Sequence, residues 1–171
     1  MTVTAVRKDL AALTLTLTAE FDAAPERVWQ LWSDPRQLER WWGPPTYPAT
    51  FTRHDLAPGS RVEYYMTGPE GDQPHGYWTI VSTEPPRRRV FRDGFANEDG
   101  SNNDDMPRNE IRVAIDSIGA GRSRMSIESR FPSTEAMGQL IAMGMEEGLT
   151  GAVGQIDAIL AEDLVTRGAP A

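Results

Sequence analysis

The chain contains no cysteine and only two histidines, His54 and His75. The absence of cysteine excludes disulfide bonds, thiolate catalysis and zinc sites built on thiolates. The two histidines do not form a His-x-x-His pair, so the sequence predicts no metal site. A Gly-x-Ser-x-Gly elbow, which marks the nucleophile of many serine hydrolases, is missing as well. We therefore expect no cofactor and assign no catalytic residue.

Positive charge and long apolar runs are also scarce. The chain has 17 Lys and Arg against 25 Asp and Glu, which gives a net charge of -8. Its one basic run, at residues 87–89, is short, so we do not expect the chain to bind nucleic acid. No segment approaches the roughly 20 apolar residues that a membrane-spanning helix requires. Because Arg7, Lys8 and Asp9 do not suit a signal peptide, we expect a cytoplasmic protein without membrane insertion.

What the sequence does contain is a series of short alternating segments. Apolar and polar residues alternate strictly over residues 13–21, which is typical of a half-buried strand. Six further strands are predicted at residues 49–54, 61–67, 75–83, 88–95, 110–118 and 124–131. Short turns connect most of them, so neighbouring strands must pair antiparallel. Without a linker or an internal repeat, residues 1–171 are expected to form one domain with a core at about residues 13–165.

Two short helices are predicted between the first and second of these strands. Pro25 suits the first position of a helix, because its missing N–H would have no partner there. Asp34 is placed to cap a second helix that begins at Pro35, with Gln37 where a capping-box partner would lie. The Gly-Pro-Pro sequence at residues 43–45 ends that helix.

The last segment, residues 133–167, predicts one long helix capped by Ser133. Apolar residues recur there at helical steps of three and four: Met137, Leu140, Ile141, Met145, Leu149, Val153, Ile156, Leu160 and Leu164. Five glycines interrupt the segment, and each costs roughly 1 kcal/mol relative to alanine in a helix. They indicate either close packing against neighbours or volume left free for a ligand. The nearby methionines suit a permissive apolar cavity, although methionine also fills cores.

In order, the elements are one strand, two short helices, six strands and a long helix. This order predicts an α+β fold in which a curved, seven-stranded antiparallel sheet surrounds the C-terminal helix. An arrangement of this kind, a helix-grip fold, tends to leave a cavity between helix and sheet.

Two parts of the sequence carry a resemblance to a known family. The first is FDAAPERVWQLWSDPRQLERWWGP at residues 21–44, and the second combines DLAPG at 55–59, GYWTI at 76–80 and EPP at 84–86. The chain resembles the heat-shock-protein-90 ATPase activator homologues, a branch of the SRPBCC superfamily that includes START and birch-pollen-allergen-like proteins. The resemblance extends over about residues 13–164 and implies the helix-grip fold with a central hydrophobic cavity.

The resemblance also implies a class of function. Relatives bind lipids, polyketides and other small apolar molecules, and a minority are cyclases or hydrolases. We therefore expect non-enzymatic binding of a small hydrophobic or amphipathic molecule. Two alternatives remain open: an enzyme, a cyclase or hydrolase, acting on such a ligand in the same cavity, and a protein-interaction module or co-chaperone-like protein, including a homodimer. Converging titratable side chains inside the cavity would favour the enzyme, and a contiguous exposed apolar patch elsewhere would favour the interaction module.

Strand alternation, the helical period and the implied grip geometry together predict which side chains line the cavity. They are Tyr64, Met66, Trp78, Val113 and Met125 on the sheet and Met137, Ile141, Met145 and Leu149 on the long helix. Of the neighbouring Trp41 and Trp42 we expect only one to contribute, and we assign Trp41 to the cavity wall. The free volume is expected near Gly144 and Gly148.

Overall fold

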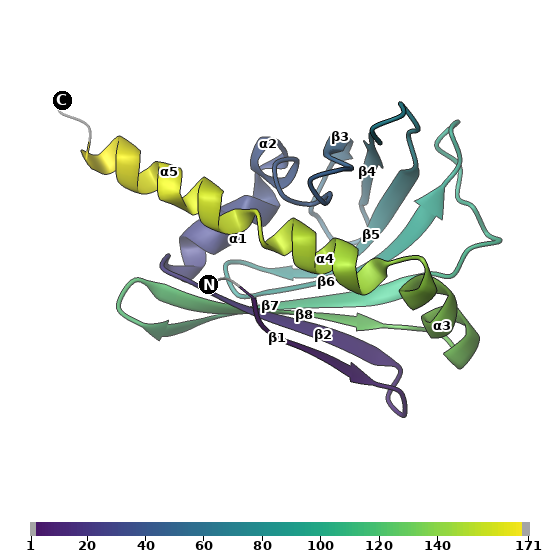
Figure 1. Cartoon of the computed structure of the whole chain (residues 1–171), viewed down its shortest axis with the longest axis horizontal. Helices are drawn as coiled ribbons and strands as arrows, with labels where there is room; N and C mark the ends of the chain where they lie inside the picture. Colours follow the sequence, from purple (N-terminus) through teal and green to yellow (C-terminus); the bar gives the residue numbers. More distant parts are fainter. Residues whose placement is uncertain (1–2, 169–171) are drawn as a thin grey trace.

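The computed structural model describes the backbone of residues 3–168 and the side chains of residues 3–163. One antiparallel sheet curves around a helical segment at the C-terminal end of the chain, which confirms the α+β helix-grip prediction (Figure 1). The strands are β1 (Val3–Asp9), β2 (Thr14–Phe21), β3 (Ala49–His54), β4 (Arg61–Met66), β5 (His75–Glu84), β6 (Arg88–Ala96), β7 (Asn109–Gly119) and β8 (Arg122–Arg130). Their order in the sheet is β1-β2-β8-β7-β6-β5-β4-β3.

The sheet has eight strands and not the predicted seven, because the first residues form an additional edge strand, β1. This strand pairs antiparallel with β2, and its register shifts between Val3 and Ala5. The irregularity places Val3 and Val6 against the core, a spacing of three residues where a regular strand would have two. Strict alternation is therefore absent from this segment, and alternation was the signal that found the other strands.

Two short helices follow β2, as predicted: α1 (Pro25–Ser33) and α2 (Pro35–Leu38). Asp34 caps α2, since its Oδ1 accepts the backbone N–H of Arg36 at 2.9 Å. The side-chain amide of Gln37 donates to Oδ2 of Asp34 at 3.0 Å. Helix α1 packs against β7 and β8, so it covers one end of the concave face of the sheet.

The C-terminal helical segment is long, but it is broken twice. It consists of α3 (Thr134–Ala142), α4 (Met145–Val153) and α5 (Ile156–Gly168), with the Ser133 side chain capping α3 as predicted. The first break is at Gly144, whose φ of 89° lies in the left-handed region that glycine tolerates best. The predicted apolar contact of Leu164 lies outside the described side chains. No helix in the described part of the chain is long and apolar enough to cross a membrane.

The core between α1 and the sheet is strongly aromatic. Trp32 is fully buried at its centre, and Trp78 stacks on Phe91 with a ring-centroid distance of 4.3 Å. The guanidinium of Arg89 is buried in the same layer, 4.7 Å from the ring centroid of Trp29. Burial lowers the pKa of Arg89 to about 10. These side chains fill the end of the concave face under α1, which leaves the opposite end for a cavity.

Candidate ligand-binding site

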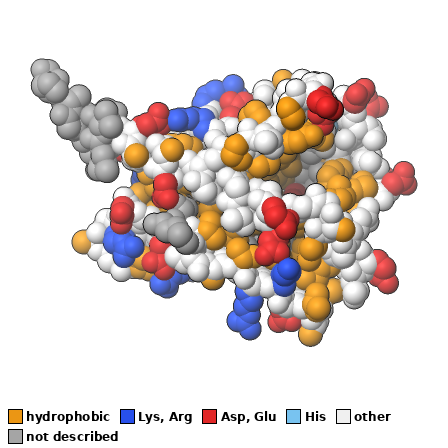
Figure 2. All heavy atoms as spheres, viewed as in Figure 1, with side chains coloured by type: hydrophobic (Ala, Val, Ile, Leu, Met, Phe, Trp, Pro, Cys, Tyr) orange, Lys and Arg blue, Asp and Glu red, His pale blue; other side chains and the backbone are white. Residues whose placement is uncertain are grey.

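A cavity of about 310 Å³ lies between the other end of the concave face and the α3–α4 segment. In the space-filling view it is a hollow flanked by hydrophobic side chains (Figure 2). The sheet contributes Tyr64, Met66, His75, Gly76, Asp93, Gly94, Phe95, Asn109, Ile111, Ile127 and Ser129 to its wall. The helical segment contributes Leu140, Met143, Gly144, Met145, Gly148 and Leu149, and loops contribute Trp42, Pro44, Pro74 and Pro107.

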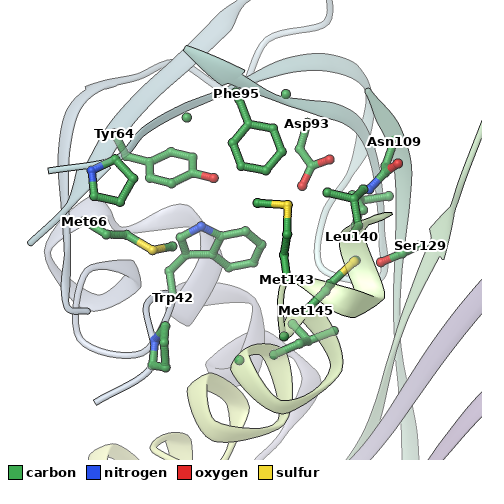
Figure 3. A pocket seen from close by; sticks show the side chains of 18 of the residues that line it. Trp42, Tyr64, Met66, Asp93, Phe95, Asn109, Ser129, Leu140, Met143 and Met145 are labelled. Carbon is green, nitrogen blue, oxygen red and sulfur yellow. The ribbon is translucent and has the colours of Figure 1, made fainter. Parts of the chain in front are cut away.

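Most of the cavity wall is apolar. The rings of Trp42, Tyr64 and Phe95 stand on one side of the cavity, and Met143 and Met145 reach in from the helical segment (Figure 3). Aromatic rings offer large, rigid contact surfaces, while methionine adapts its shape to what it meets. The wall is therefore suited to the apolar body of a small molecule.

Tyr64 brings a hydroxyl group into this apolar surrounding. It pairs with Gly76 across β4 and β5, and its ring lies over the glycine backbone. The hydroxyl points toward the middle of the cavity (Figure 3). Burial raises the pKa of Tyr64 above its ordinary value, and the negative charge of Asp93 adds to this rise, so the group stays a neutral hydroxyl at physiological pH.

Asp93 places a carboxyl group in the same cavity. It follows Phe91 on the concave face of β6, and its side chain points into the cavity (Figure 3). Burial raises the pKa of Asp93 to about 7, although backbone N–H groups of Asn109 and of Asp93 itself partly offset the rise. None of the residues that line the cavity is a lysine or an arginine. The carboxyl therefore has no cationic partner there.

Three further polar residues border the cavity. Asn109 is buried, and its Oδ1 has no hydrogen-bond partner among the described residues. Ser129 lies near it on β8, two strands away from Asp93 (Figure 3). His75 borders the cavity at the start of β5, but its ring turns to the other face of the sheet, 5.5 Å from the ring of Tyr65, with its Nδ1 2.8 Å from the carbonyl oxygen of Gln73. Within the described residues no cluster of three His, Cys, Asp or Glu side chains could hold a metal ion.

The break between α3 and α4 shapes the helical side of the cavity. Met143 lies at the break, and its side chain points into the cavity although 58% of the residue is exposed (Figure 3). A Cβ atom on Gly148, one turn into α4, would have no other atom within 4 Å. The free volume expected near Gly144 and Gly148 therefore coincides with the cavity wall.

Four of the ten residues that we assigned to the wall from the sequence lie there: Tyr64, Met66, Met145 and Leu149. Trp41 does not, because its ring turns into the core and its indole N–H donates to the carbonyl oxygen of Leu31 at 2.9 Å. The neighbouring Trp42 occupies the wall instead.

The other five assigned residues also lie outside the wall. Trp78, Val113 and Met125 belong to the core, where Met125 accepts a hydrogen bond from the indole of Trp32 at 3.3 Å. All three point inward as expected. Val113 and Met125 do so at the end of the sheet that α1 covers, and Trp78 lies behind the wall residue Trp42, with their ring centroids 4.9 Å apart. Met137 and Ile141 pack in a separate cluster with Leu15, Phe131 and Leu140. Of this cluster's core, Leu140 does reach the wall.

Sequence reasoning missed most of the polar part of the site. Asp93, Asn109 and Ser129 were not singled out. Phe95, Leu140 and Met143 were not assigned to the wall either, although Leu140 belongs to the predicted helical period and Met143 is one of the methionines noted in the last segment. One signal was present: Asp93 alternates with Phe91 and Phe95 along one predicted strand, which places it on the inner face. An acidic residue between two inward aromatic residues is unusual enough to mark a site.

Comparison with known proteins gives a family and several similar structures. The family model described as activator of Hsp90 ATPase homolog 1-like protein matches residues 22–161. A protein from Arthrobacter aurescens is 48% identical, with a TM-score of 0.90 over 94% of this chain and 93% of that chain. Protein Ms6760 from Mycobacterium smegmatis is 47% identical, with a TM-score of 0.85 over 92% of this chain and 96% of that chain.

A more distant structure shows the fold alone. A protein from Staphylococcus epidermidis is 21% identical, with a TM-score of 0.79 over 94% of this chain and 95% of that chain. No functionally curated protein matches the chain.

Proposed function

The chain belongs to the family of activator of Hsp90 ATPase homolog 1-like proteins, and on this premise we propose that it binds a small hydrophobic or amphipathic molecule without transforming it. The family is part of the SRPBCC superfamily, whose fold is associated with binding small hydrophobic ligands. The observation that carries the proposal is the cavity of about 310 Å³ between sheet and helices. Its size is at the lower end of the roughly 300–1,000 Å³ that is usual for small-molecule sites.

The composition of the wall supports the same function. Small-molecule sites combine apolar surface with a few placed polar groups. Here the polar groups are gathered on the sheet, around Asp93 and Asn109, while the helical side offers Leu140, Met145 and Leu149. A ligand with an apolar body and one polar end would satisfy both sides of the cavity.

Native mass spectrometry of the protein purified from its own host tests this function. We expect a fraction of the protein to carry one additional small mass. The same protein, denatured and refolded in ligand-free buffer, is the control and should show the bare mass. Bare mass in every preparation, together with no binding of small apolar probes, would contradict the proposal.

An enzyme acting on such a ligand is the second candidate, and one observation favours it. Asp93 and Tyr64 are two titratable groups that point into one apolar cavity, and a carboxyl with a pKa of about 7 suits general acid–base work. No hydrogen bond joins these two side chains, so there is no ready relay between them. Proton exchange at the α-carbon of 4-phenyl-2-butanone in deuterated water would detect such a base, and equal rates for wild type and Asp93→Asn would remove this candidate.

An interaction module or a homodimer receives less support. The exposed large apolar side chains of the described residues are Leu10, Val81 and Met143. They lie on the β1–β2 turn, on β5 and at the α3–α4 break, so they do not form one patch. Met143 also belongs to the cavity wall, which accounts for its exposure without a protein partner.

A further inference from the structure

We propose that the ligand of this cavity carries a protonated nitrogen, which pairs with the Asp93 carboxylate while the apolar body of the ligand packs against Trp42, Phe95 and α4. The inference rests on the proposed binding function and specifies the chemical class of the ligand. Three features carry it: the cavity contains one carboxylate, it has no lysine or arginine in its described wall, and aromatic rings surround the carboxylate.

The first step is the isolation of Asp93. Its side chain points into the cavity, and among the described residues it is the only acidic one in a wall without lysine or arginine. Its hydrogen bonds come from backbone N–H groups, of Asn109 and of Asp93 itself, and a largely enclosed carboxylate without a cationic partner is costly, so such groups are usually paired or protonated. Within the described residues no lysine or arginine lines the cavity beside it. A cationic group on the ligand would supply the missing partner.

The second step concerns the aromatic rings beside the carboxyl. Trp42, Tyr64 and Phe95 stand around the same part of the cavity as Asp93 (Figure 3). The faces of aromatic rings attract ammonium groups, and the attraction is greatest where water is excluded. A carboxylate among aromatic rings favours a cation through two independent interactions. The same carboxylate repels a fatty acid or another anionic amphiphile.

The third step is the sign of the pH dependence. Among the titratable side chains of the cavity wall, Tyr64 from β4 faces Asp93, whereas His75 from β5 turns to the other face of the sheet, where its ring lies 5.5 Å from that of Tyr65. Strands β7 and β8 present Asn109 and Ser129, and the helical segment presents only apolar side chains. Tyr64 remains neutral throughout the physiological range. An alkylamine stays protonated there, so its binding should strengthen as Asp93 loses its proton. Binding should therefore be tighter at about pH 8 than at about pH 5.5.

Three probes of one shape test the proposal: 4-phenylbutylamine, 4-phenylbutanol and 4-phenylbutyrate, which share an apolar body and differ in the terminal group. Calorimetric titration of the full chain at about pH 8 should give at least about tenfold tighter binding of the amine than of the alcohol, with the carboxylate weakest. In Asp93→Asn the ratio of amine to alcohol affinity should fall to about twofold or less. Glu147→Gln is the matched control, because Glu147 is exposed on α4 outside the cavity wall, and it should keep the wild-type ratio.

The wild-type protein supplies a second measurement that does not depend on a variant. The amine-to-alcohol ratio should fall by about tenfold between about pH 8 and about pH 5.5, and His75→Gln should retain this fall. An equal affinity for amine and alcohol, tightest binding of the carboxylate, or a ratio unchanged in Asp93→Asn would overturn the ammonium proposal and leave the binding function standing. Failure of all three probes to bind would instead contradict the binding function itself.

Discussion

The ring of Tyr64 lies directly over the backbone of Gly76, so that a Cβ atom at position 76 would be 2.5 Å from the tyrosine oxygen and 2.6 Å from Cζ. The two residues are paired across β4 and β5. The missing side chain of Gly76 thus allows the Tyr64 ring to lie flat against the sheet and to point its hydroxyl into the cavity. A local choice of glycine on one strand therefore sets the shape of the binding site.

Gly76→Ala should destabilise the protein by roughly 1–3 kcal/mol, because the new methyl group would force the Tyr64 ring out of its place. In a protein that already carries Tyr64→Ala, the same Gly76→Ala substitution should cost much less stability, because there is no ring left for the methyl group to clash with. Urea denaturation of the four proteins measures the coupling. Losses that simply add would show that the Tyr64 ring does not rest on Gly76.

Gly148→Leu should fill the cavity from α4. The new side chain meets free space, so the gain in helix propensity, roughly 0.8–1 kcal/mol, should leave stability equal or higher. Affinity for the neutral dye N-phenyl-1-naphthylamine should fall at the same time. Gly138→Leu is the matched control: Gly138 is exposed on α3, has equally free space and does not line the cavity, so dye binding should persist. Strong destabilisation by Gly148→Leu would mean that α4 is tightly packed at this position.

Asp93 should make the stability of the protein depend on pH. Burial raises its pKa from 3.8 to about 7, so between these values the folded chain holds a proton that the unfolded chain has released. Stability from this group is therefore highest in acid, falls as the pH rises through about 4 to 7, and is level above. At 1.36 kcal/mol per pKa unit the loss is at most roughly 4 kcal/mol.

Asp93→Asn removes this titration, so the variant should gain stability relative to wild type as the pH rises. We expect a relative gain of roughly 2–3 kcal/mol between about pH 5 and about pH 8, measured by urea denaturation at both. Other titrating groups are common to both proteins and cancel in the difference. If the free energies of unfolding of Asp93→Asn and wild type differed by the same amount at both pH values, Asp93 would have an ordinary pKa.

Asp34→Ala should cost about 1 kcal/mol, because the N–H of Arg36 loses the carboxylate that caps α2. Asp34→Ser retains a capping oxygen and should lose at most a few tenths of that amount. Dye affinity should be unchanged in both variants, since Asp34 is not part of the cavity wall. A melting temperature of Asp34→Ala equal to wild type would show that the cap contributes nothing.

On the seven predicted strands, alternation was sufficient to predict the face on which the inward side chains lie. Val113 and Met125 do point to the concave side, as their strand patterns require. Their position along the strand depends on where α1 packs, and this tertiary contact leaves no local pattern in the sequence. The strand pattern therefore predicted the correct face of the sheet for Val113 and Met125, but it could not predict that they lie at the end covered by α1 and away from the cavity.

The helical side shows a second limit. A continuous helix from residue 133 would keep one phase, and Met137 and Ile141 would then share a face with Met145. The left-handed residue Gly144 interrupts that phase: Leu140, Met143 and Met145 line the cavity, while Ile141 packs only against the cluster of Leu15 and Phe131. The glycines were noticed as a group, but only the backbone conformation shows which of them interrupts the helix.

The most direct test of the binding site follows the methionine methyl groups by NMR. The seven methionines include three in the cavity wall, Met66, Met143 and Met145, and two in the core, Met125 and Met137. In protein labelled with carbon-13 at these methyl groups, 4-phenylbutylamine or 4-phenylbutanol should shift the first three signals through the ring current of its phenyl group. The signals of Met125 and Met137 should stay in place. Shifts centred on Met125 and Met137, or no shift at saturating probe, would contradict a ligand site between the sheet and α4.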